Sequence, residues 1–475
     1  MLGMNLKSEN IVQKIWNLCH TLRGDGISYH EYISELTYLL FLKIAEENGT
    51  ESLLPEHCRW HKLVNYDGTD LLTEYRDMLT FLGGHADNNI VKKIYAFPTT
   101  VFSHSENLKA VIDGINKLDW HSVQQDGMGD IYEGLLAKNS QDARSGAGQY
   151  FTPRPLVDSI VKLVKPSLGE TIQDPATGSG GFLISADQYI RSANTSKKYQ
   201  SKPPVYEGVE IEKGTYRICL MNAFLHQLSG SIILGDALTR DADQLSPADV
   251  ILANPPFGAK AGSVRKSRSD ILYSTTNKQL AFLQHIYSSL KPGGRAAVVI
   301  PDNVLFEEGV GKKIRQDLMN KCNLHTILRL PSGIFYSPGV KTNVLFFNKG
   351  TKLKDNTQKV WVFDMRSANI KFGKRRPLSS EDFSDFEKLY GDDPNGVSLR
   401  KETTKELRWK CFGRDDIKAQ DDNLDFNWLS HSVDSEMELF TEPEEIAQSI
   451  LTHLRFALNE IEELTTELDL KEGSE

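Results

Sequence analysis

The sequence has few cysteines, and none of them are closely paired. The 475-residue chain holds five, with no CxxC spacing: Cys19, Cys58, Cys219, Cys322 and Cys411. An odd number of scattered cysteines argues against a disulfide framework and against a structural zinc site. Only EHCRWH brings metal-ligand types close together (His57, Cys58 and His61), and we interpret it as a solvated loop. We therefore expect reduced thiols and no bound metal.

Long apolar runs are also missing. The stretch LTYLLFLKIA, from Leu36 to Ala45, is too short to cross a bilayer and contains Lys43. The first twenty residues mix Asn, Lys, Ser and Glu with apolar residues, which is unlike a secretory leader. We therefore expect a cytoplasmic protein without a membrane partner.

Positive charge is in short supply as well. The chain has 55 Lys and Arg residues against 64 Asp and Glu residues, a net charge of −9. Because Lys and Arg supply most non-specific affinity for nucleic-acid phosphate, such a chain is poorly suited to holding nucleic acid unaided. Either the substrate is not a nucleic acid, or a partner shares the binding.

The chain does show a change of pattern near residue 150. Before it, apolar residues recur at helical spacing after a candidate N-cap, Ser28, with Glu31 three residues on: Tyr32, Leu36, Leu39, Leu40 and Ile44. The segment MGDIYEGLLAKNSQ (128–141) has the pattern of another helix. We interpret these apolar stripes as core and predict a helical N-terminal part.

After residue 150, short apolar runs alternate with segments of helical pattern. The predicted strands are 170–173, 205–211, 231–238, 249–257, 295–301 and 325–331, with 341–350 and 359–365 as the last strands or a small extension. Such alternation predicts an α/β fold with a doubly wound, mostly parallel sheet. Ligands of such sheets bind beyond the carboxyl ends of the strands.

The chain becomes polar beyond Arg366. YGDDPNGVS (390–398) is typical of an exposed turn or linker. The last forty residues return to a helical pattern with a short coiled-coil stripe, in which Thr465 occupies the missing step: Leu451, Leu454, Leu458, Ile461 and Leu468. This helix can pack on its own chain or on a partner, and the sequence leaves both open.

A glycine-rich turn follows the first predicted strand. In DPATGSGGF, Gly178, Gly180 and Gly181 allow a tight turn and close approach of a ligand, and the following helix directs its free N–H groups at the loop. The third glycine of a dinucleotide fingerprint is absent, as is the Lys-Ser/Thr pair of a P-loop. NAD and ATP are therefore weak candidates.

Acidic residues follow the next two strands. Glu210 and Glu212 end the second, where a carboxylate can bind both ribose hydroxyls, and Asp236 follows the third beside the same cleft. Each of these is unremarkable when taken alone, because carboxylates at strand ends are often only solvated.

The fourth strand ends in NPPF, Asn254 to Phe257. Pro255 and Pro256 donate no backbone hydrogen bond, so the strand cannot continue and its carbonyl groups project into the cleft. Asn254 adds a side-chain acceptor, and Phe257 adds a flat face for stacking. Converging acceptors beside an aromatic ring suit a planar amino group such as that of adenine.

This combination resembles the amino-group DNA methyltransferases, whose hallmark is D/N-P-P-Y/F/W after the fourth strand. GQYFTPRPLVDSIVKLV (148–164) ahead of DPATGSGGF and NPPF is similar to the order of the gamma class of N6-adenine enzymes. Three further segments resemble the methylation subunit, HsdM, of type I restriction-modification systems: 21–47, 129–138 and 444–464. The resemblance covers most of the chain and is vaguest over 390–440.

The resemblance implies S-adenosylmethionine as the cofactor and assigns roles to particular residues. Glu210 would bind the ribose, and Asp236 would lie near the adenine amino group of the cofactor. The cofactor-binding set would be Gln149, Tyr150, Phe151, Thr152, Pro153, Asp174, Gly178, Ser179, Gly180, Glu210 and Asp236. Residues 151–153 of this set would contact its methionine part. The catalytic set would be Asn254, Pro255, Pro256 and Phe257, with no metal.

Phe257 stands where many relatives have Tyr, which removes a hydroxyl and keeps the stacking face, so we expect activity to survive. Basic residues follow NPPF directly and are candidates for contacting DNA phosphate: Lys260, Arg265, Lys266 and Arg268.

The resemblance also implies the organisation and the partners. We expect an N-terminal helical domain over 1–140 for subunit or DNA contacts, the catalytic domain over 141–366, a polar extension over 367–440 and a helix over 441–475 for contact with a specificity subunit. Two copies of this chain would join one specificity subunit on double-stranded DNA, and a separate motor-nuclease subunit would complete the complex. Two alternatives stay open: N-methylation of RNA adenine or protein glutamine, and a catalytically silent scaffold that binds the cofactor.

Overall fold

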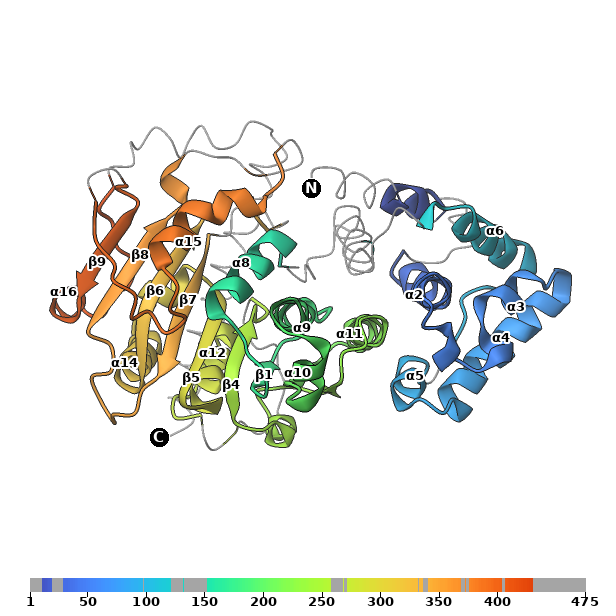
Figure 1. Ribbon diagram of the computed structural model, residues 1–475, viewed down its shortest axis with the longest axis horizontal. Helices are drawn as coiled ribbons and strands as arrows, with labels where there is room; N and C mark the ends of the chain where they lie inside the picture. Colours follow the sequence, from blue (N-terminus) through green and yellow to red (C-terminus); the bar gives the residue numbers. More distant parts are fainter. Residues whose placement is uncertain are drawn as a thin grey trace, which may run out of the picture. The chain divides into compact units, whose positions relative to one another are not determined.

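The computed structural model describes residues 11–18, 29–96, 98–120, 131, 152–257, 268, 271–331, 333–335, 341–368, 372, 376–403 and 406–429. It divides into two compact units (Figure 1). The first unit comprises 1–148, 178–184 and 212–234, and the second comprises 149–177, 185–211 and 235–475. No helix in the described part of the chain is long and apolar enough to cross a membrane.

The first unit is built mainly from helices. The predicted apolar stripe lies on α2 (Tyr29–Glu47), and all five of its members are buried, which confirms that helix as core. The aromatic rings of Phe41 and Phe224 lie 5.2 Å apart, so α11 (Lys213–Leu225) packs with the N-terminal helices. The other elements of this unit are α3 (Trp60–Val64), α4 (Gly68–His85), α5 (Asn89–Ile94), α6 (Ser105–Asn116) and β3 (Gly230–Leu234). The helix predicted over 128–141 lies outside the described residues except for Ile131, which is buried.

The second unit carries the other strands of the sheet. They are β1 (Thr171–Asp174), β2 (Val205–Glu210), β4 (Ala248–Ala253), β5 (Leu290–Pro301), β6 (Cys322–Leu330), β7 (Thr342–Lys349), β8 (Lys359–Asp364) and β9 (Trp409–Gly413). Its helices include α8 (Arg154–Val164), α10 (Ser196–Ser201), α12 (Lys278–Ser289), α13 (Asn303–Phe306), α14 (Val310–Lys321), α15 (Ser384–Tyr390) and α16 (Arg414–Ala419), while α9 (Gly181–Ala193) contributes to both units.

The nine described strands form one sheet in the order β3-β2-β1-β4-β5-β7-β6-β8-β9. The pairs β1/β2, β1/β4, β4/β5 and β6/β8 are parallel, whereas β7 runs antiparallel to both β5 and β6, and β9 runs antiparallel to β8. All eight predicted strands form, and the mostly parallel α/β sheet is confirmed. The strand at 342–349 is inserted between β5 and β6 and does not end the sheet.

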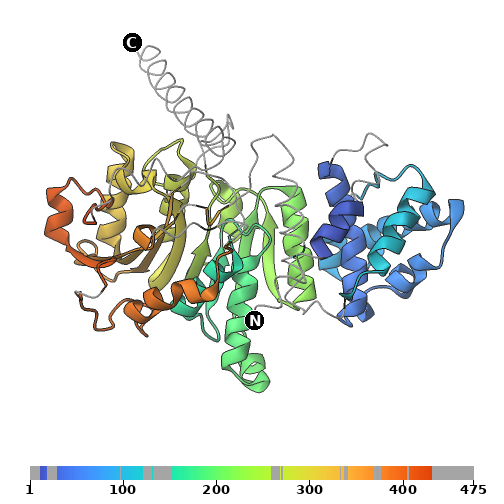
Figure 2. The same ribbon diagram turned by 90° about the horizontal axis from the view of Figure 1, so that it is seen from above.

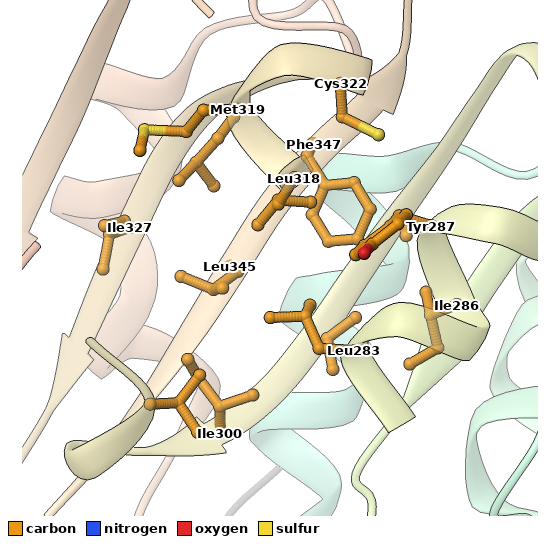
Figure 3. Close-up of a cluster of buried hydrophobic side chains, with 14 of the residues drawn as sticks. Leu283, Ile286, Tyr287, Ile300, Leu318, Met319, Cys322, Ile327, Leu345 and Phe347 are labelled. Atoms are coloured by element: carbon orange, nitrogen blue, oxygen red, sulfur yellow. The ribbon is translucent and has the colours of Figure 1, made fainter. Parts of the chain in front are cut away.

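Helices cover both faces of the sheet (Figure 2). Because side chains alternate along a strand, Leu345 and Phe347 of β7 face one side and Phe346 faces the other. On the first side α12 and α14 enclose a continuous apolar cluster with β4, β5, β6 and β7 (Figure 3). On the other side the Phe346 ring lies 5.9 Å from Phe386 and 5.3 Å from Tyr390, both on α15. Burying both faces explains why the strand sequences are continuous apolar runs.

The sheet continues beyond residue 366. Trp409–Gly413 forms β9, and the described residues of YGDDPNGVS form a turn beginning at the buried Tyr390. A Cβ at Gly396 would lie 2.4 Å from His325 of β6, so this turn packs against the sheet and is not a linker. The coiled-coil segment over 451–468 lies outside the described residues.

Candidate functional site

Three neighbouring parallel strands bring the predicted polar residues to one edge of the sheet. β1 pairs with β2, with Asp174 opposite Gly208, and with β4, with Ile172 opposite Val250. Asp174 therefore ends the middle strand, Glu210 ends β2, and Asn254 follows β4 directly. Ligands of open α/β sheets bind at this end of the strands.

Asp174 is a fully enclosed carboxyl group at this edge. Burial raises its pKa to about 8, and the nearby Glu210 carboxylate acts in the same direction, while the Ala176 N–H opposes the shift by donating to Oδ1 at 3.0 Å. Both the N–H and the hydroxyl of Thr177 donate to the carbonyl of Val209, at 3.0 and 3.1 Å. The turn after β1 is therefore fixed to the end of β2.

The glycines after Thr177 have the conformation that the sequence predicts. Gly178 and Gly180 adopt φ of 54° and 87°, in the left-handed region that other residues rarely enter. A Cβ on Gly178 would meet no atom within 4 Å, whereas one on Gly180 would lie 3.1 Å from Cys219 Sγ. The backbone at Gly178 thus offers an open approach, and α9 begins at Gly181. Free N–H groups at such a helix start attract anionic groups.

The structure distinguishes the two glutamates that the sequence offered at the end of β2. Glu212 is the N-cap of α11, with its carboxylate accepting from the N–H groups of Gly214 (2.9 Å) and Thr215 (2.6 Å). Glu210 instead lies on the strand, nearly buried, and its carbonyl accepts from the Gly235 N–H at 2.9 Å. Glu210 is therefore the better ligand candidate.

Asp236 lies in the loop after β3. It directly follows Gly235, whose N–H donates to the Glu210 carbonyl. Its Oδ1 accepts from the Leu238 N–H at 2.9 Å, and its own N–H donates to Asp241 Oδ2 at 2.9 Å. The Thr239 hydroxyl donates to its carbonyl at 2.8 Å. The Asp236 carboxylate therefore stabilises the loop after β3, and the Gly235 N–H keeps this loop beside the end of β2.

The NPPF segment leaves the sheet as predicted, because β4 ends at Ala253. Asn254 and Phe257 are half-buried, Pro255 is buried and Pro256 is exposed. The Asn254 amide donates from Nδ2 to Thr152 Oγ1 at 2.9 Å, although these residues are 102 apart in sequence. The carbonyl of Pro256 accepts from Gln279 Nε2 at 3.0 Å.

The other predicted site residues lie at the start of α8, contact the protein itself, or fall outside the described residues. Pro153 is the N-cap of α8. Arg268 donates from Nη1 to the Ala237 carbonyl at 3.3 Å and lies 2.8 Å from His285 Nδ1, so its described contacts are with the protein itself. The remaining predicted residues lie outside the described residues: Gln149, Tyr150, Phe151, Lys260, Arg265 and Lys266.

Sequence reasoning missed two residues at this edge. Ile211 directly follows the last residue of β2, Glu210, and is 58% exposed, which is unusual for an isoleucine beside a buried strand. An apolar residue directly after an acidic strand end is the sequence pattern from which Ile211 could have been predicted as a site residue. Gln279 was missed because it lies 23 residues from Pro256, and nothing local in the sequence indicates that contact.

The segment EHCRWH is not the solvated loop that the sequence predicted. Residues Glu56–Cys58 form a 3-10 turn and Trp60–Val64 form α3. Cys58 is buried, and burial raises its thiol pKa to about 12. Among the described residues, one group could bring three metal ligands within 4.8 Å of one another, namely Glu46, Glu51 and His61. Glu46 of this group already pairs with Lys43 at 2.6 Å.

Comparisons with known proteins agree with one another. The family model described as N-6 DNA methylase matches residues 123–437, and that described as the HsdM N-terminal domain matches 11–115. The EcoKI type I restriction enzyme methylase subunit of Escherichia coli K12 is 42% identical, over 98% of this chain and 96% of its own length.

Two solved structures are also similar to this chain. The crystal structure of the EcoKI M protein has a TM-score of 0.56 and 39% identity, covering 97% of this chain and 96% of that one. A chain from a structure describing complex assembly and conformational transition of the type I restriction-modification system has a TM-score of 0.68 and 26% identity, covering 96% and 98%.

Proposed function

Since the chain belongs to the N-6 DNA methylases, as the methylase subunit of a type I restriction-modification system, we propose that it methylates N6 of a flipped adenine using S-adenosylmethionine. The chain is an adenine-specific DNA methyltransferase. The observation that carries the finer proposal is the placement of Asn254 and the NPPF carbonyls beside Asp174 and Glu210 at the ends of β4, β1 and β2.

The residues at the strand ends fit this cofactor. Gly178 leaves open space where a side chain would otherwise block approach, and Glu210 provides a carboxylate suited to ribose hydroxyls. We assign the cofactor to Thr152, Pro153, Asp174, Gly178, Ser179, Gly180, Glu210 and Asp236, together with Gln149, Tyr150 and Phe151. Ile211 offers an exposed apolar face for the purine ring.

S-adenosylmethionine, when bound, supplies a methyl group on a positively charged sulfur. The protein residues orient the acceptor: Asn254 Oδ1 and the Pro255 carbonyl accept hydrogen bonds from N6, which keeps its lone pair out of ring conjugation. With the cofactor bound, the N6–carbon bond would form as the carbon–sulfur bond breaks, S-adenosylhomocysteine would be the leaving group, and the proton lost from N6 would pass to water. Removing the base from the duplex costs a few kcal/mol, and stacking on Phe257 returns about 1–3 kcal/mol.

Target choice is assigned to partners. A net charge of −9 is consistent with two copies of this chain joining one specificity subunit on double-stranded DNA in the cytoplasm. The N-terminal domain (1–140) and the C-terminal helix (441–475) would make subunit contacts. They flank the catalytic domain (141–366) and the extension (367–440). Motor and nuclease functions belong to another subunit. Lys260, Arg265, Lys266 and Arg268 would contact DNA phosphate.

The test is labelled methyl transfer by the tagged chain together with the subunits that copurify from its native host. The acceptor is genomic DNA from a host strain lacking the gene, and digestion to nucleosides identifies the product. We expect N6-methyladenine, and an Asn254→Ala complex should be slower by about 10²–10³-fold, the usual cost of one lost stabilising group. Asn194→Ala, on the α9 end, serves as the matched control.

An Asn254→Ala complex as active as wild type would contradict the proposed role of NPPF. Transfer to RNA or to protein glutamine, with none to DNA, would redirect the activity to those acceptors. Cofactor binding without transfer to any acceptor would indicate a scaffold.

A further inference from the structure

The NPPF segment is held by side chains from two other parts of the chain. We propose that Thr152 and Gln279 are positioning residues for methyl transfer, Thr152 by orienting the Asn254 carboxamide and Gln279 by fixing the peptide that carries Phe257. This inference rests on the proposed function, because it concerns the same acceptor pocket. The two contacts are the 2.9 Å bond from Asn254 Nδ2 to Thr152 Oγ1 and the 3.0 Å bond from Gln279 Nε2 to the Pro256 carbonyl.

Thr152 can act as a fixed reference because the helix that follows it is anchored. The Arg295 guanidinium donates to the last carbonyls of α8, at Val164 (2.6 Å) and Lys165 (2.7 Å). In the middle of α8, the Ser159 hydroxyl donates to Glu387 of α15 at 2.9 Å. The Thr152 hydroxyl, two residues before α8 begins, therefore has a defined position relative to the sheet.

The orientation of the Asn254 amide decides whether the proposed reaction can proceed. An amide presents an acceptor oxygen on one side and two N–H donors on the other. The target N6 is also a donor, so an amide turned by 180° would place donors against a donor. In the structure Thr152 Oγ1 accepts from Nδ2, so the carboxamide is held with its nitrogen toward Thr152 and its oxygen Oδ1 on the opposite side.

Gln279 is 3% exposed and has its own support. Asn277 Oδ1 accepts from the N–H groups of Gln279 (3.0 Å) and Leu280 (3.3 Å), and Asn277 Nδ2 donates to Glu307 at 2.7 Å. Gln279 is thereby fixed at the start of α12. Holding the Pro256 carbonyl fixes the plane of the peptide between Pro256 and Phe257, and so the direction in which the aromatic ring leaves the backbone.

The test uses the copurified complex with three test substitutions and two control substitutions. Thr152→Val removes the hydroxyl at nearly constant volume, and Thr152→Ser restores it. Gln279→Met keeps the length and removes the amide. The matched controls are Ser192→Ala, which removes an exposed hydroxyl near the end of α9, and Gln316→Met, which removes an amide bonded to Asp422. Two quantities are measured: the single-turnover methylation rate at saturating S-adenosylmethionine, and the Kd of the cofactor without DNA.

We expect Thr152→Val and Gln279→Met to lower the saturated rate about 10–100-fold, the range expected when reacting groups are misplaced by about 1 Å. Because Thr152→Val keeps the backbone and the side-chain volume that the cofactor would contact, the cofactor Kd should change less than about threefold. The serine variant should recover most of the rate, and both controls should match wild type. The separation of rate from Kd distinguishes positioning from a general structural effect, which would lower the Tm and weaken cofactor binding together.

Two results would overturn the inference while leaving the proposed function intact. The first is a methylation rate unchanged at every cofactor concentration, and the second is a loss of rate below saturation that excess cofactor fully restores. The second result would mean that Thr152 acts only by contacting the cofactor. A wild-type complex that transfers no methyl to DNA would overturn both the proposed function and this inference.

Discussion

Asp174 is the described site carboxyl whose protonation is most altered by folding. Its pKa of about 8 lies above its ordinary value of 3.8, so between those pH values the folded protein holds a proton that the unfolded chain has lost. The free energy of unfolding must therefore fall as pH rises through this window, by up to about 1.4 kcal/mol per pH unit from this group. The ligand-free protein therefore loses stability at the proposed cofactor site as the pH rises through this window.

Asp174→Asn should remove that loss. We expect the variant to gain stability over wild type progressively from pH 5 to pH 8, measured by urea unfolding of the ligand-free chain at several pH values. The exposed Asp243 provides the control, since Asp243→Asn should give a curve parallel to that of wild type. Parallel curves for Asp174→Asn would show that the carboxyl is ionised in the folded state.

At the residue scale the sequence predicted what is encoded locally. The turn at Gly178 and Gly180 follows from the positive φ that glycine allows, and the end of β4 follows from the prolines of NPPF. The strand ends are visible in the apolar pattern. The pairing of Thr152 with Asn254 was not predictable because 102 residues separate them, and only the fold brings them together. The resemblance chose Glu210 over Glu212, and the structure adds a physical reason, because Glu212 is the N-cap of α11.

At the scale of elements, α15 is attached to the sheet by aromatic packing. Phe386 is fully buried and lies 5.9 Å from Phe346, 5.5 Å from Phe363 and 5.8 Å from Tyr390 by ring centroids. The same helix contributes Glu387, which binds Ser159 of α8. The polar C-terminal part of the chain therefore supports the helix that follows Thr152.

Phe386→Ala should lower the free energy of unfolding by about 3–5 kcal/mol, the usual cost of removing a buried phenylalanine. Urea unfolding of the purified chain measures it. Phe306→Ala is the control, because Phe306 is 42% exposed and its loss should cost far less. Equal effects of the two substitutions would contradict the assignment of Phe386 to the core.

The sequence predicted eight strands and missed the ninth. β9 (WKCFG) is only five residues long and lies in a polar region, so its hydrophobic signal was weak. The position of β7 between β5 and β6 was also not predictable. An apolar pattern indicates that a segment is a strand, but it does not indicate which strands pair with it. Both features depend on long-range pairing that composition does not reveal.

At the scale of the whole molecule, the net charge of −9 bears on DNA binding. We expect the isolated chain to bind duplex DNA at or beyond the weak end of the 10⁻⁴–10⁻⁶ M range typical of non-specific binding. The copurified complex should bind its specific sites at about 10⁻⁸ M or tighter, with a steep dependence on salt. Fluorescence anisotropy across a salt series measures both, and nanomolar binding by the chain alone would contradict the need for a partner.

The strand order also has a consequence for biosynthesis. β1 lies between β2 and β4, and β4 needs β5 on its other side, so the crevice cannot close until the ribosome has added the roughly 130 residues from β1 to the end of β5. At about 5–20 residues per second this takes roughly 6–26 s. During that interval the apolar strands of the nascent chain lack some of their neighbours, and unpaired strands of this kind are prone to aggregation and are substrates for chaperones.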